Sequence, residues 1–287
     1  KIYKCTFGLI GSMFYFLNPR TFAHSFYNPK DSISQALIAC ALLPLLLSYK
    51  NKKISMAIAS GILIGIAITI RLPVLYLPIL FICTMVSYPL IFKTSTEDRR
   101  KILLTTFYFI LSVSISIVFF FPHLWESPIH NFITIFNNLN KHQWSGNNLF
   151  FGNLIPASNV PWYYITTWIF ISTPLPFLFF LIVGSIRLIF DIFISHGKDN
   201  LFKAFMLFGF ITPLMATIIL NSTLYNGWRH LFFVYPFIAY LMTYGFKFVY
   251  RWLSMKFKSN LMYALIFCTF IHPIYFIYTS HPNQQVF

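Results

Sequence analysis

Long apolar runs alternate with short polar segments along the whole chain. The runs cover roughly residues 2–17, 33–49, 55–70, 74–92, 103–121, 163–187, 204–220, 231–247 and 261–278. Most of them reach the length of about 17–20 residues that crosses the hydrocarbon of a bilayer as a helix. In hydrocarbon, only a helix satisfies all the backbone hydrogen bonds of a single segment. The pattern therefore predicts an all-α, polytopic bundle of about nine transmembrane helices.

The composition supports a membrane protein over a soluble one. Of the 287 residues, 57% are hydrophobic and 9% are charged, whereas a soluble domain carries about 25% charged residues. A net charge of +15 could suggest nucleic acid as a partner. The basic residues lie in short loops between apolar runs, however, and form no continuous basic face. We therefore expect membrane lipids and no nucleic acid as partners, and the oligomeric state stays open.

The orientation follows from the distribution of Lys and Arg, which concentrate in cytoplasmic loops. Sixteen of the 21 fall in one set of alternate connections, and the other set holds Arg20, Lys30, Arg71, Lys141 and Arg229. The first set is therefore predicted to be cytoplasmic. The outer segments are then 18–32, 71–73, 122–162, 221–230 and 279–287. The chain is predicted to form one membrane domain, residues 1–287, with the loop 122–162 as a small extracytoplasmic cap.

The first outer segment, NPRTFAHSFYNPKDS, gathers Arg20, His24, Lys30 and Asp31 directly before an apolar run. Asp31 and Glu126 are the two acidic residues on the predicted outer side, so they are the carboxylate candidates for acid/base chemistry there. Asp31 also suits the N-cap position of the following helix. Both interpretations of Asp31 stay open, because one residue can do both.

Two further outer positions carry cationic side chains. Arg71 lies between two apolar runs with almost no loop, so it either snorkels to lipid headgroups or contacts an anionic ligand such as a phosphate. In NSTLYNGWRHLFFVYP, the turn residues Asn226 and Gly227 bring together Tyr225, Trp228, Arg229 and His230. Arg and His suit an anionic headgroup, and the aromatic rings suit a sugar face. Anchoring at the membrane interface is the alternative.

The long outer loop combines an amphipathic segment with aromatic residues. Residues 129–139 have helical apolar spacing and are expected to lie in the membrane interface. Trp144 and Trp162 follow. His123, His130 and His142 lack metal-type spacing, and all four cysteines lie in predicted spans. No cofactor is indicated, and the need for a divalent cation stays open.

Several of these stretches, in this order, resemble a known family. They are NPRTFAHSFYNPKD, GILIGIAITIRLP, FPHLWESP with QWSGNNLFFGN, VPWYYITTWIFISTP and LYNGWRHLFFVYP, between about residues 18 and 240. The chain resembles a bacterial membrane glycosyltransferase of the GT-C type. It is similar to the dolichyl-phosphate-mannose–protein mannosyltransferase and aminoarabinose transferase group (glycosyltransferase family 39-like).

The resemblance implies inverting transfer of a sugar from a polyprenyl-phosphate donor to a lipid, glycan or protein acceptor outside the bacterial inner membrane. The family's main base lies in a loop that no residue here matches, so we expect it upstream of Lys1. Asp31 matches the second acidic position and is expected to have a supporting role. Arg71 matches a basic position expected to touch the donor phosphate.

The remaining expectations divide the outer residues between donor and acceptor. Glu126 is a weaker catalytic candidate. The donor phosphate or sugar is expected to contact Arg20, His24, Lys30, Arg71, Tyr225, Trp228, Arg229 and His230. Trp144 and Trp162 are expected on the acceptor side. The main alternative is a transporter or lipid flippase, which favours inverted repeats and ionisable residues within spans. A purely structural role in the membrane is a second alternative.

Overall fold

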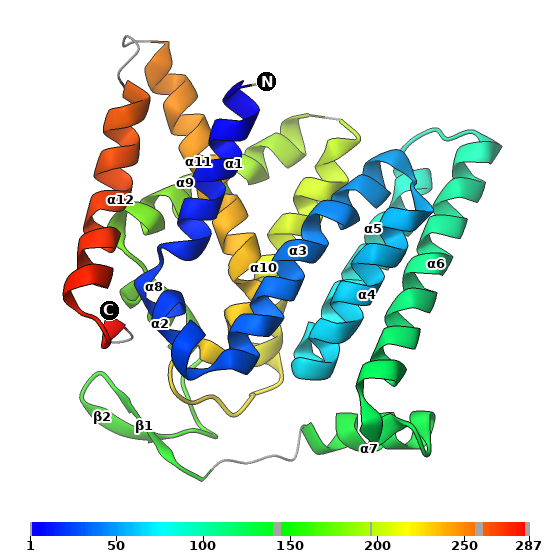
Figure 1. Ribbon diagram of the computed structural model, residues 1–287, viewed down its shortest axis with the longest axis horizontal. Helices are drawn as coiled ribbons and strands as arrows, with labels where there is room; N and C mark the ends of the chain where they lie inside the picture. The colour runs from blue at the N-terminus through cyan, green and yellow to red at the C-terminus, as the bar shows by residue number, and fades with distance from the viewer. Residues whose placement is uncertain (1, 140–144, 196, 256–260, 285–287) are drawn as a thin grey trace. The chain divides into compact units, whose positions relative to one another are not determined.

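The computed structural model describes residues 2–139, 145–195, 197–255 and 261–284 and folds them almost wholly into helices (Figure 1). The α-helices are α1 Ile2–Phe16, α2 Pro19–Tyr27, α3 Pro29–Asn51, α4 Ile54–Ile70, α5 Tyr76–Ile91, α6 Thr96–Phe120, α7 Pro128–Leu139, α8 Tyr164–Ile171, α9 Leu175–Ile194, α10 Asp199–Ile219, α11 Tyr235–Ser254 and α12 Leu261–Thr279. Short 3-10 helices are η1 Leu72–Leu75, η2 Pro122–Leu124 and η3 Arg229–Val234. The predicted all-α fold class is confirmed.

Seven helical segments of the described chain are long and apolar enough to cross a membrane. They are Pro29–Asn51, Leu72–Ile91, Thr96–Phe120, Leu175–Ile194, Asp199–Ile219, Arg229–Ser254 and Met262–Thr279. Two shorter apolar helices cover Cys5–Phe16 and Ile54–Ile70. Large apolar side chains such as Leu90 (80% exposed) and Phe193 (78%) cover their outward faces, which suits contact with lipid. The chain is therefore a multi-pass membrane protein, as its sequence predicts.

One small sheet lies outside the helices. Strands β1 Asn147–Phe150 and β2 Asn153–Pro156 pair antiparallel, with Leu149 opposite Leu154. The two loop residues Phe151 and Gly152 both have positive φ, 48° and 80°, as a tight hairpin turn of the I′ kind requires. The apolar pattern of the sequence predicts no strand here.

Two predicted segments fold differently from expectation. In the apolar run 163–187, Pro174 and Pro176 predict a kink or a reentrant start of the helix. The structure has a complete interruption of the helix between Ile171 and Leu175. The segment 18–32 is predicted as a loop, and most of it is helical. The Asn18 side chain accepts a hydrogen bond from Thr21 N (3.1 Å) and caps α2, and Pro29 begins α3.

The chain divides into two compact units, which are described separately. Unit 1 contains residues 1–32, 166–210 and 234–287, and unit 2 contains residues 33–165 and 211–233. In each unit, "outer end" denotes the end that carries the connections predicted to lie outside. The outer end of unit 1 carries α2 and the start of α3. The outer end of unit 2 carries Arg71, the hairpin and the turn 221–230.

Unit 2 is built around a close pair of helices, α4 and α6. Gly61 and Gly65 of α4 are spaced four residues apart, like Ser112 and Ser116 of α6, so each pair lies on one helix face. A methyl group at Gly61 would come within 1.9 Å of Ser112 Oγ, and one at Gly65 within 2.5 Å of Ser116 Cβ. Small residues at both positions thus allow the backbones to approach closely, as in small-xxx-small interfaces of membrane helices.

Unit 1 has an equivalent contact between α9 and α11. A methyl group at Gly184 would lie 1.9 Å from the carbonyl oxygen of Leu241, and one at Gly245 would lie 2.2 Å from that of Phe180. The ring of Phe14 from α1 packs against Phe177 and Phe180 beside this crossing. Tyr235 of α11 donates a hydrogen bond to the carbonyl oxygen of Phe14 (2.8 Å). Close backbone contact and aromatic packing therefore hold α1, α9 and α11 together.

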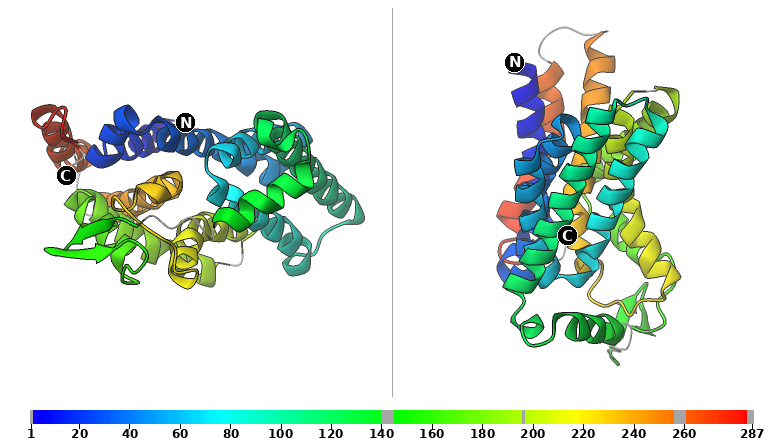
Figure 2. Two further views of the ribbon diagram at one scale, coloured as in Figure 1. Left: turned by 90° about the horizontal axis from the view of Figure 1, so that it is seen from below. Right: turned by 90° about the vertical axis from the view of Figure 1, so that its right-hand side faces the viewer.

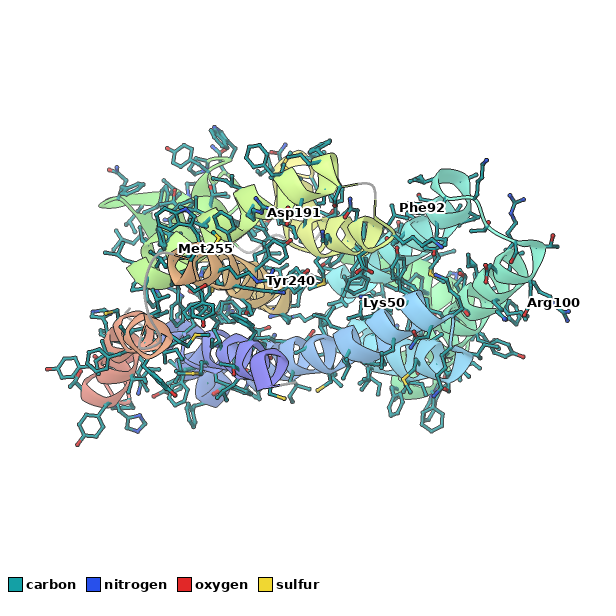
Figure 3. All side chains as sticks on the ribbon, turned by 90° about the horizontal axis from the view of Figure 1, so that it is seen from above. Lys50, Phe92, Arg100, Asp191, Tyr240 and Met255 are labelled. Atoms are coloured by element: carbon teal, nitrogen blue, oxygen red, sulfur yellow. The ribbon has the colours of Figure 1, made fainter. Side chains whose placement is uncertain are left out.

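The predicted cytoplasmic ends carry exposed or paired charges. Figure 3 looks onto these ends and labels Lys50, Phe92 and Arg100 in unit 2 and Asp191 in unit 1. Asp191 pairs with Arg187 one turn earlier on α9 (2.8 Å) and accepts a hydrogen bond from Tyr244 of α11. The hydrogen bond from Tyr244 to Asp191 joins α11 to α9 about two turns beyond Gly184.

The amphipathic segment of the long loop forms a helix, as predicted. It is α7, which lies crosswise to α6 within unit 2 (Figures 1 and 2). Asn131 fixes its first turn by donating a hydrogen bond to the carbonyl oxygen of His123 (2.7 Å). Ile129, Ile133 and Phe136 are 78%, 53% and 49% exposed. This apolar stripe and the crosswise direction suit the expected position in the membrane interface, which stays a prediction.

The glycine contact of unit 1 predicts a sharp cost for one methyl group. Gly184→Ala should lower the free energy of unfolding by about 1–3 kcal/mol, the usual cost of overpacking, because the neighbouring atoms are backbone and cannot rotate away. Gly8→Ala is the matched control, since no atom lies within 4 Å of its added methyl. Thermal unfolding in detergent would measure both. Equal melting temperatures for the two variants would contradict the close contact.

The orientation predicts which positions are reached from outside the cell. Asn153→Cys on the hairpin should react with a membrane-impermeant maleimide, whereas Glu97→Cys should react only after permeabilisation. The native Cys5, Cys40, Cys83 and Cys268 are exposed on apolar helices, where surrounding lipid would keep a water-soluble, membrane-impermeant reagent away. They should therefore give little background. The opposite labelling pattern would reverse the assigned orientation.

Candidate functional site

The outer end of unit 1 contains three buried side chains that can carry a charge. Among the Asp, Glu, Lys, Arg and His residues that the structure describes, the buried ones are Arg20, His24 and Asp31, which are 8%, 8% and 2% exposed. All three come from α2 and the first turn of α3. Burying such groups costs free energy unless they are hydrogen-bonded or paired, so their position is a feature that the fold maintains.

Arg20 and His24 lie one turn apart on α2 and have aromatic and polar neighbours. The guanidinium carbon of Arg20 lies 4.7 Å from the centre of the Trp168 ring of α8, a distance at which a cation and an aromatic face attract. His24 Nδ1 lies 2.6 Å from the side-chain nitrogen of Asn28. Since the amide donates, Nδ1 accepts, and the ring proton of a neutral His24 is then on Nε2.

Asp31 lies within helix α3 and not at its N-cap. The helix begins at Pro29, so Asp31 belongs to the first turn, and the N-cap interpretation is wrong by position. A carboxylate in the first turn is still favoured by the helix dipole. Its neighbour Lys30 is exposed and therefore does not join the buried group.

The outer end of unit 2 contains a second cluster, formed by Tyr225, Arg229 and His230. The Tyr225 and His230 rings meet edge to face with 4.4 Å between their centres, and the Arg229 guanidinium carbon lies 5.2 Å from the Tyr225 ring centre. Arg229 and His230 are half-buried. The sequence predicts this grouping, and the turn explains it, because Asn226 and Gly227 both adopt positive φ (55° and 70°) and fold the chain back.

Three hydrogen bonds tie this turn to the long loop of the same unit. Leu224 N donates to the carbonyl oxygen of Ala157 (3.1 Å), and the buried Asn148 side chain donates to that of Leu224 (2.7 Å). Gly227 N donates to the hydroxyl of Tyr164 (3.3 Å). These bonds connect residues far apart in sequence, so the turn has a defined position against the hairpin and the start of α8.

Trp228 occupies the interior of unit 2. It is 0% exposed, and its ring packs against Phe232 with 4.7 Å between centres. Its indole is therefore part of the packing beneath the turn and does not present a face to a ligand from solvent. The neighbouring Tyr225 is partly exposed and takes that place in the cluster.

Arg71 lies at the end of α4, where its extended backbone separates α4 from η1. The side chain is half-buried. A few residues later Tyr76 contacts the ring of Phe233 from η3 (6.0 Å between centres). The Arg71 segment and the segment that follows the turn 221–230 thus lie at the same end of unit 2, as the orientation predicts.

The remaining predicted residues are dispersed. Glu126 is exposed in the bend after η2, and Trp162 is 70% exposed. Trp144 lies outside the described residues. Within the described part of the chain, no three His, Cys, Asp or Glu side chains are grouped to hold a metal ion.

Sequence reasoning misses Tyr164, Trp168 and Asn148 as supports of these clusters. Tyr164 and Trp168 belong to the stretch VPWYYITTWIFISTP, where aromatic residues suit either a span or a binding surface. Asn148 belongs to the unpredicted hairpin. No local pattern distinguishes these three, because their roles depend on contacts with distant segments.

No protein-family model, no curated protein and no solved structure matches this chain. The candidate site therefore depends on its own geometry and chemistry, and the family resemblance depends on the motifs quoted above.

The bond between Tyr164 and Gly227 predicts a local change. Tyr164→Phe should remove it and cost about 1 kcal/mol, so amide hydrogen exchange should accelerate in residues 224–230. Tyr278→Phe is the control, because that ring is 83% exposed on α12. Unchanged exchange in the turn of the Tyr164 variant would show that the hydroxyl does not hold it.

Proposed function

We propose that the protein is a membrane glycosyltransferase that moves a sugar from a polyprenyl-phosphate-linked donor to a lipid, glycan or protein acceptor. The reaction takes place at the outer face of a bacterial inner membrane and inverts the anomeric centre. The observation that carries the proposal is the burial of Arg20, His24 and Asp31 together at the outer end of unit 1.

The burial of Arg20, His24 and Asp31 indicates a chemical role, because charges that only set the membrane orientation need no burial. Charges that only set orientation lie exposed, as Glu97, Arg99 and Arg100 do at the cytoplasmic end. A transferase needs a carboxylate and cations in a place screened from bulk water, where charge–charge interactions are stronger. An acid, a base and a permanent cation within one short segment meet that need.

The leaving group explains the cations. Cleavage of the bond between sugar and polyprenyl phosphate leaves a phosphate with an additional negative charge, which cationic hydrogen-bond donors stabilise. The guanidinium carbons of Arg20 and Arg229 lie over the rings of Trp168 and Tyr225. The N–H groups at the edge of each guanidinium plane then suit phosphate oxygens. His230 and Arg71 add positive or polar character at the outer end of unit 2.

Asp31 is proposed to assist the acceptor. A carboxylate takes the proton of an attacking hydroxyl or amine as the new bond to sugar forms. The family resemblance assigns the main base to another loop, so Asp31 is given a supporting role. It would orient the acceptor or share its proton.

A flippase for lipid-linked sugars is the second candidate, and one observation favours it. The interruption between α8 and α9 places buried Ser172 and Thr173 in a broken helix, a feature of many transporters. Among the described Asp, Glu, Lys, Arg and His residues, however, the buried ones lie at the outer end of unit 1, which suits chemistry on one side of the membrane.

The site assignment predicts that substitutions in the outer residues lower sugar transfer without lowering the amount of protein in the membrane. Asp31→Asn, Arg71→Ala and Arg229→Ala should each lower by about tenfold or more the rate of sugar transfer from a polyprenyl-phosphate donor in isolated membranes. Asp98→Asn and Arg100→Ala are the controls, because both side chains are exposed at the cytoplasmic end and should leave the rate unchanged. Amounts in the membrane should be equal for all five.

Two results would count against the proposal. Unchanged transfer in all three outer variants would overturn the site assignment. Movement of a fluorescent lipid-linked sugar across vesicles that contain the purified protein, without any transfer to acceptor, would favour the flippase.

A further inference from the structure

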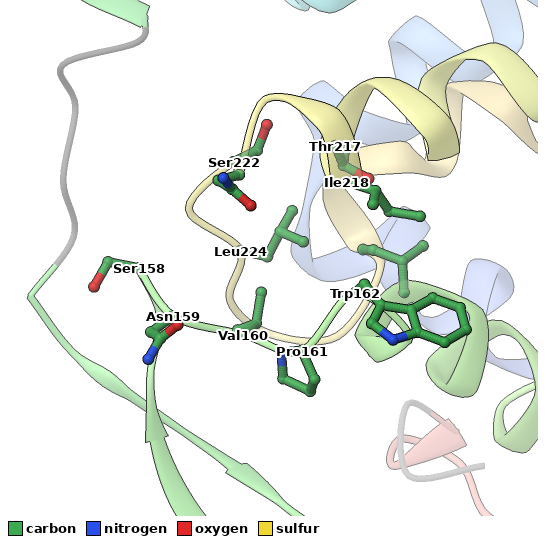
Figure 4. A pocket seen from close by; sticks show the side chains of 11 residues that line it. Ser158, Asn159, Val160, Pro161, Trp162, Thr217, Ile218, Ser222 and Leu224 are labelled. Atoms are coloured by element: carbon green, nitrogen blue, oxygen red, sulfur yellow. The ribbon is translucent and has the colours of Figure 1, made fainter.

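A cavity of about 340 Å³ lies within unit 2, between residues 158–165 of the long loop and the C-terminal end of α10 (Figure 4). Its lining consists of Ser158, Asn159, Val160, Pro161, Trp162, Ile165, Thr217, Ile218, Asn221, Ser222 and Leu224. Residues 158–162 and 221–224 of the lining belong to segments predicted to lie outside, and Ile165, Thr217 and Ile218 belong to the adjoining ends of two predicted spans. The cavity is therefore assigned to the outer end of unit 2. Its volume is at the lower limit of the range of about 300–1,000 Å³ typical of small-molecule sites.

The walls of the cavity are fixed by backbone hydrogen bonds. Leu224 N donates to the Ala157 carbonyl oxygen (3.1 Å) and joins the two walls directly. Helix α10 ends at Ile219. Asn221 follows at a φ of 45°, and Ser222 N donates to the Thr217 carbonyl oxygen (3.1 Å). This is the bonding of a left-handed helix cap, so the backbone that carries the Asn221 and Ser222 side chains has a defined conformation.

The side chains in this cavity are polar but uncharged. Ser158, Asn159, Asn221 and Ser222 make no side-chain hydrogen bond to the residues that the structure describes. Each hydroxyl or amide can both donate and accept. A phosphate would need Arg or Lys among the lining residues, and a cation would need carboxylates. None of these residue types lines the cavity.

Trp162 supplies the apolar surface of the cavity. Its side chain is 70% exposed, so one indole face is open to a ligand, and Figure 4 shows the ring at one edge of the lining. A pyranose has hydroxyls around its edge and C–H groups on its faces. Amide and hydroxyl groups beside an open indole match both surfaces.

We propose that this cavity binds an uncharged sugar residue of the acceptor. That the bound sugar belongs to the acceptor rests on the proposed function. The binding of a neutral sugar follows from the lining residues alone. The cavity thus gives a preference for neutral acceptor glycans over uronic acids and amino sugars, whose charges would lose water there without gaining an ionic partner.

Direct binding tests the proposal without any transferase assay. The purified protein would be placed in lipid nanodiscs without alkyl-glycoside detergent, because such detergents would offer the cavity their own sugar. Saturation-transfer NMR would then compare the methyl glycosides of glucose, galactose and mannose with glucuronate and glucosamine. At least one neutral glycoside should bind about tenfold or more tightly than either charged sugar.

Variants link the binding to the cavity. Trp162→Ala should weaken the neutral glycoside about tenfold, and the double variant Asn159→Ala/Ser222→Ala should do the same. Trp125→Ala is the matched control, because Trp125 is also exposed (62%) in the long loop and does not line the cavity. The Trp125→Ala variant should bind the neutral glycoside as tightly as the unchanged protein does.

The outcomes separate this inference from the proposed function. Equal affinity for charged and neutral sugars, no sugar binding, occupation by lipid acyl chains, or equal effects of Trp125→Ala and Trp162→Ala would each overturn the inference. Sugar transfer with an unchanged acceptor KM in Trp162→Ala would overturn it and leave the transferase standing. Trp162-dependent binding of a neutral sugar in a protein that transfers nothing would support the cavity and overturn the transferase.

Discussion

Direct contact between helix backbones holds each unit together. Apolar side chains gain little by leaving lipid for one another, so membrane helices associate through close packing of small residues. Gly61 and Gly65 provide that contact in unit 2, and Gly184 provides it in unit 1. In each unit, this close contact fixes the position of one helix against the other. The outer ends of these helices carry the outer connections. The positions of the polar side chains therefore depend on glycines deep in the apolar region.

The two ends of the helices use their polar residues differently. At the cytoplasmic end, most charges in the connections are exposed or form local pairs such as Lys101 with Glu97, and they mainly fix the orientation. At the outer end, Arg20, His24 and Asp31 are buried, and the turn 221–230 is bonded to a distant loop. Burying such charged groups costs free energy of folding. We therefore assign the chemistry to the outer end.

Apolar periodicity is sufficient to predict the helices that cross the membrane, because the bilayer sets their length and their hydrogen bonding. It does not predict α2 or the hairpin, because both depend on local residue pairs. Asn-Pro at residues 18 and 28 marks the starts of α2 and α3, and Phe151 with Gly152 forms the hairpin turn. The Tyr225–Arg229–His230 cluster is predictable, since one turn brings it together. The burial of Trp228 and the cavity beside Trp162 are not, because both depend on bonds between distant segments, such as Leu224 with Ala157.

The connection between α3 and α4 has a consequence for how the protein is made. Lys52 lies against the rings of Tyr49 and Tyr88, and its carbonyl oxygen accepts a hydrogen bond from Thr105 of α6 (3.2 Å). Lys52 and Lys53 alone join α3 to α4, so the two helices are synthesised in direct succession. The glycine face of α4 then meets lipid until α6 is synthesised. Biogenesis of unit 2 is thus complete only when a later helix arrives to cover that face.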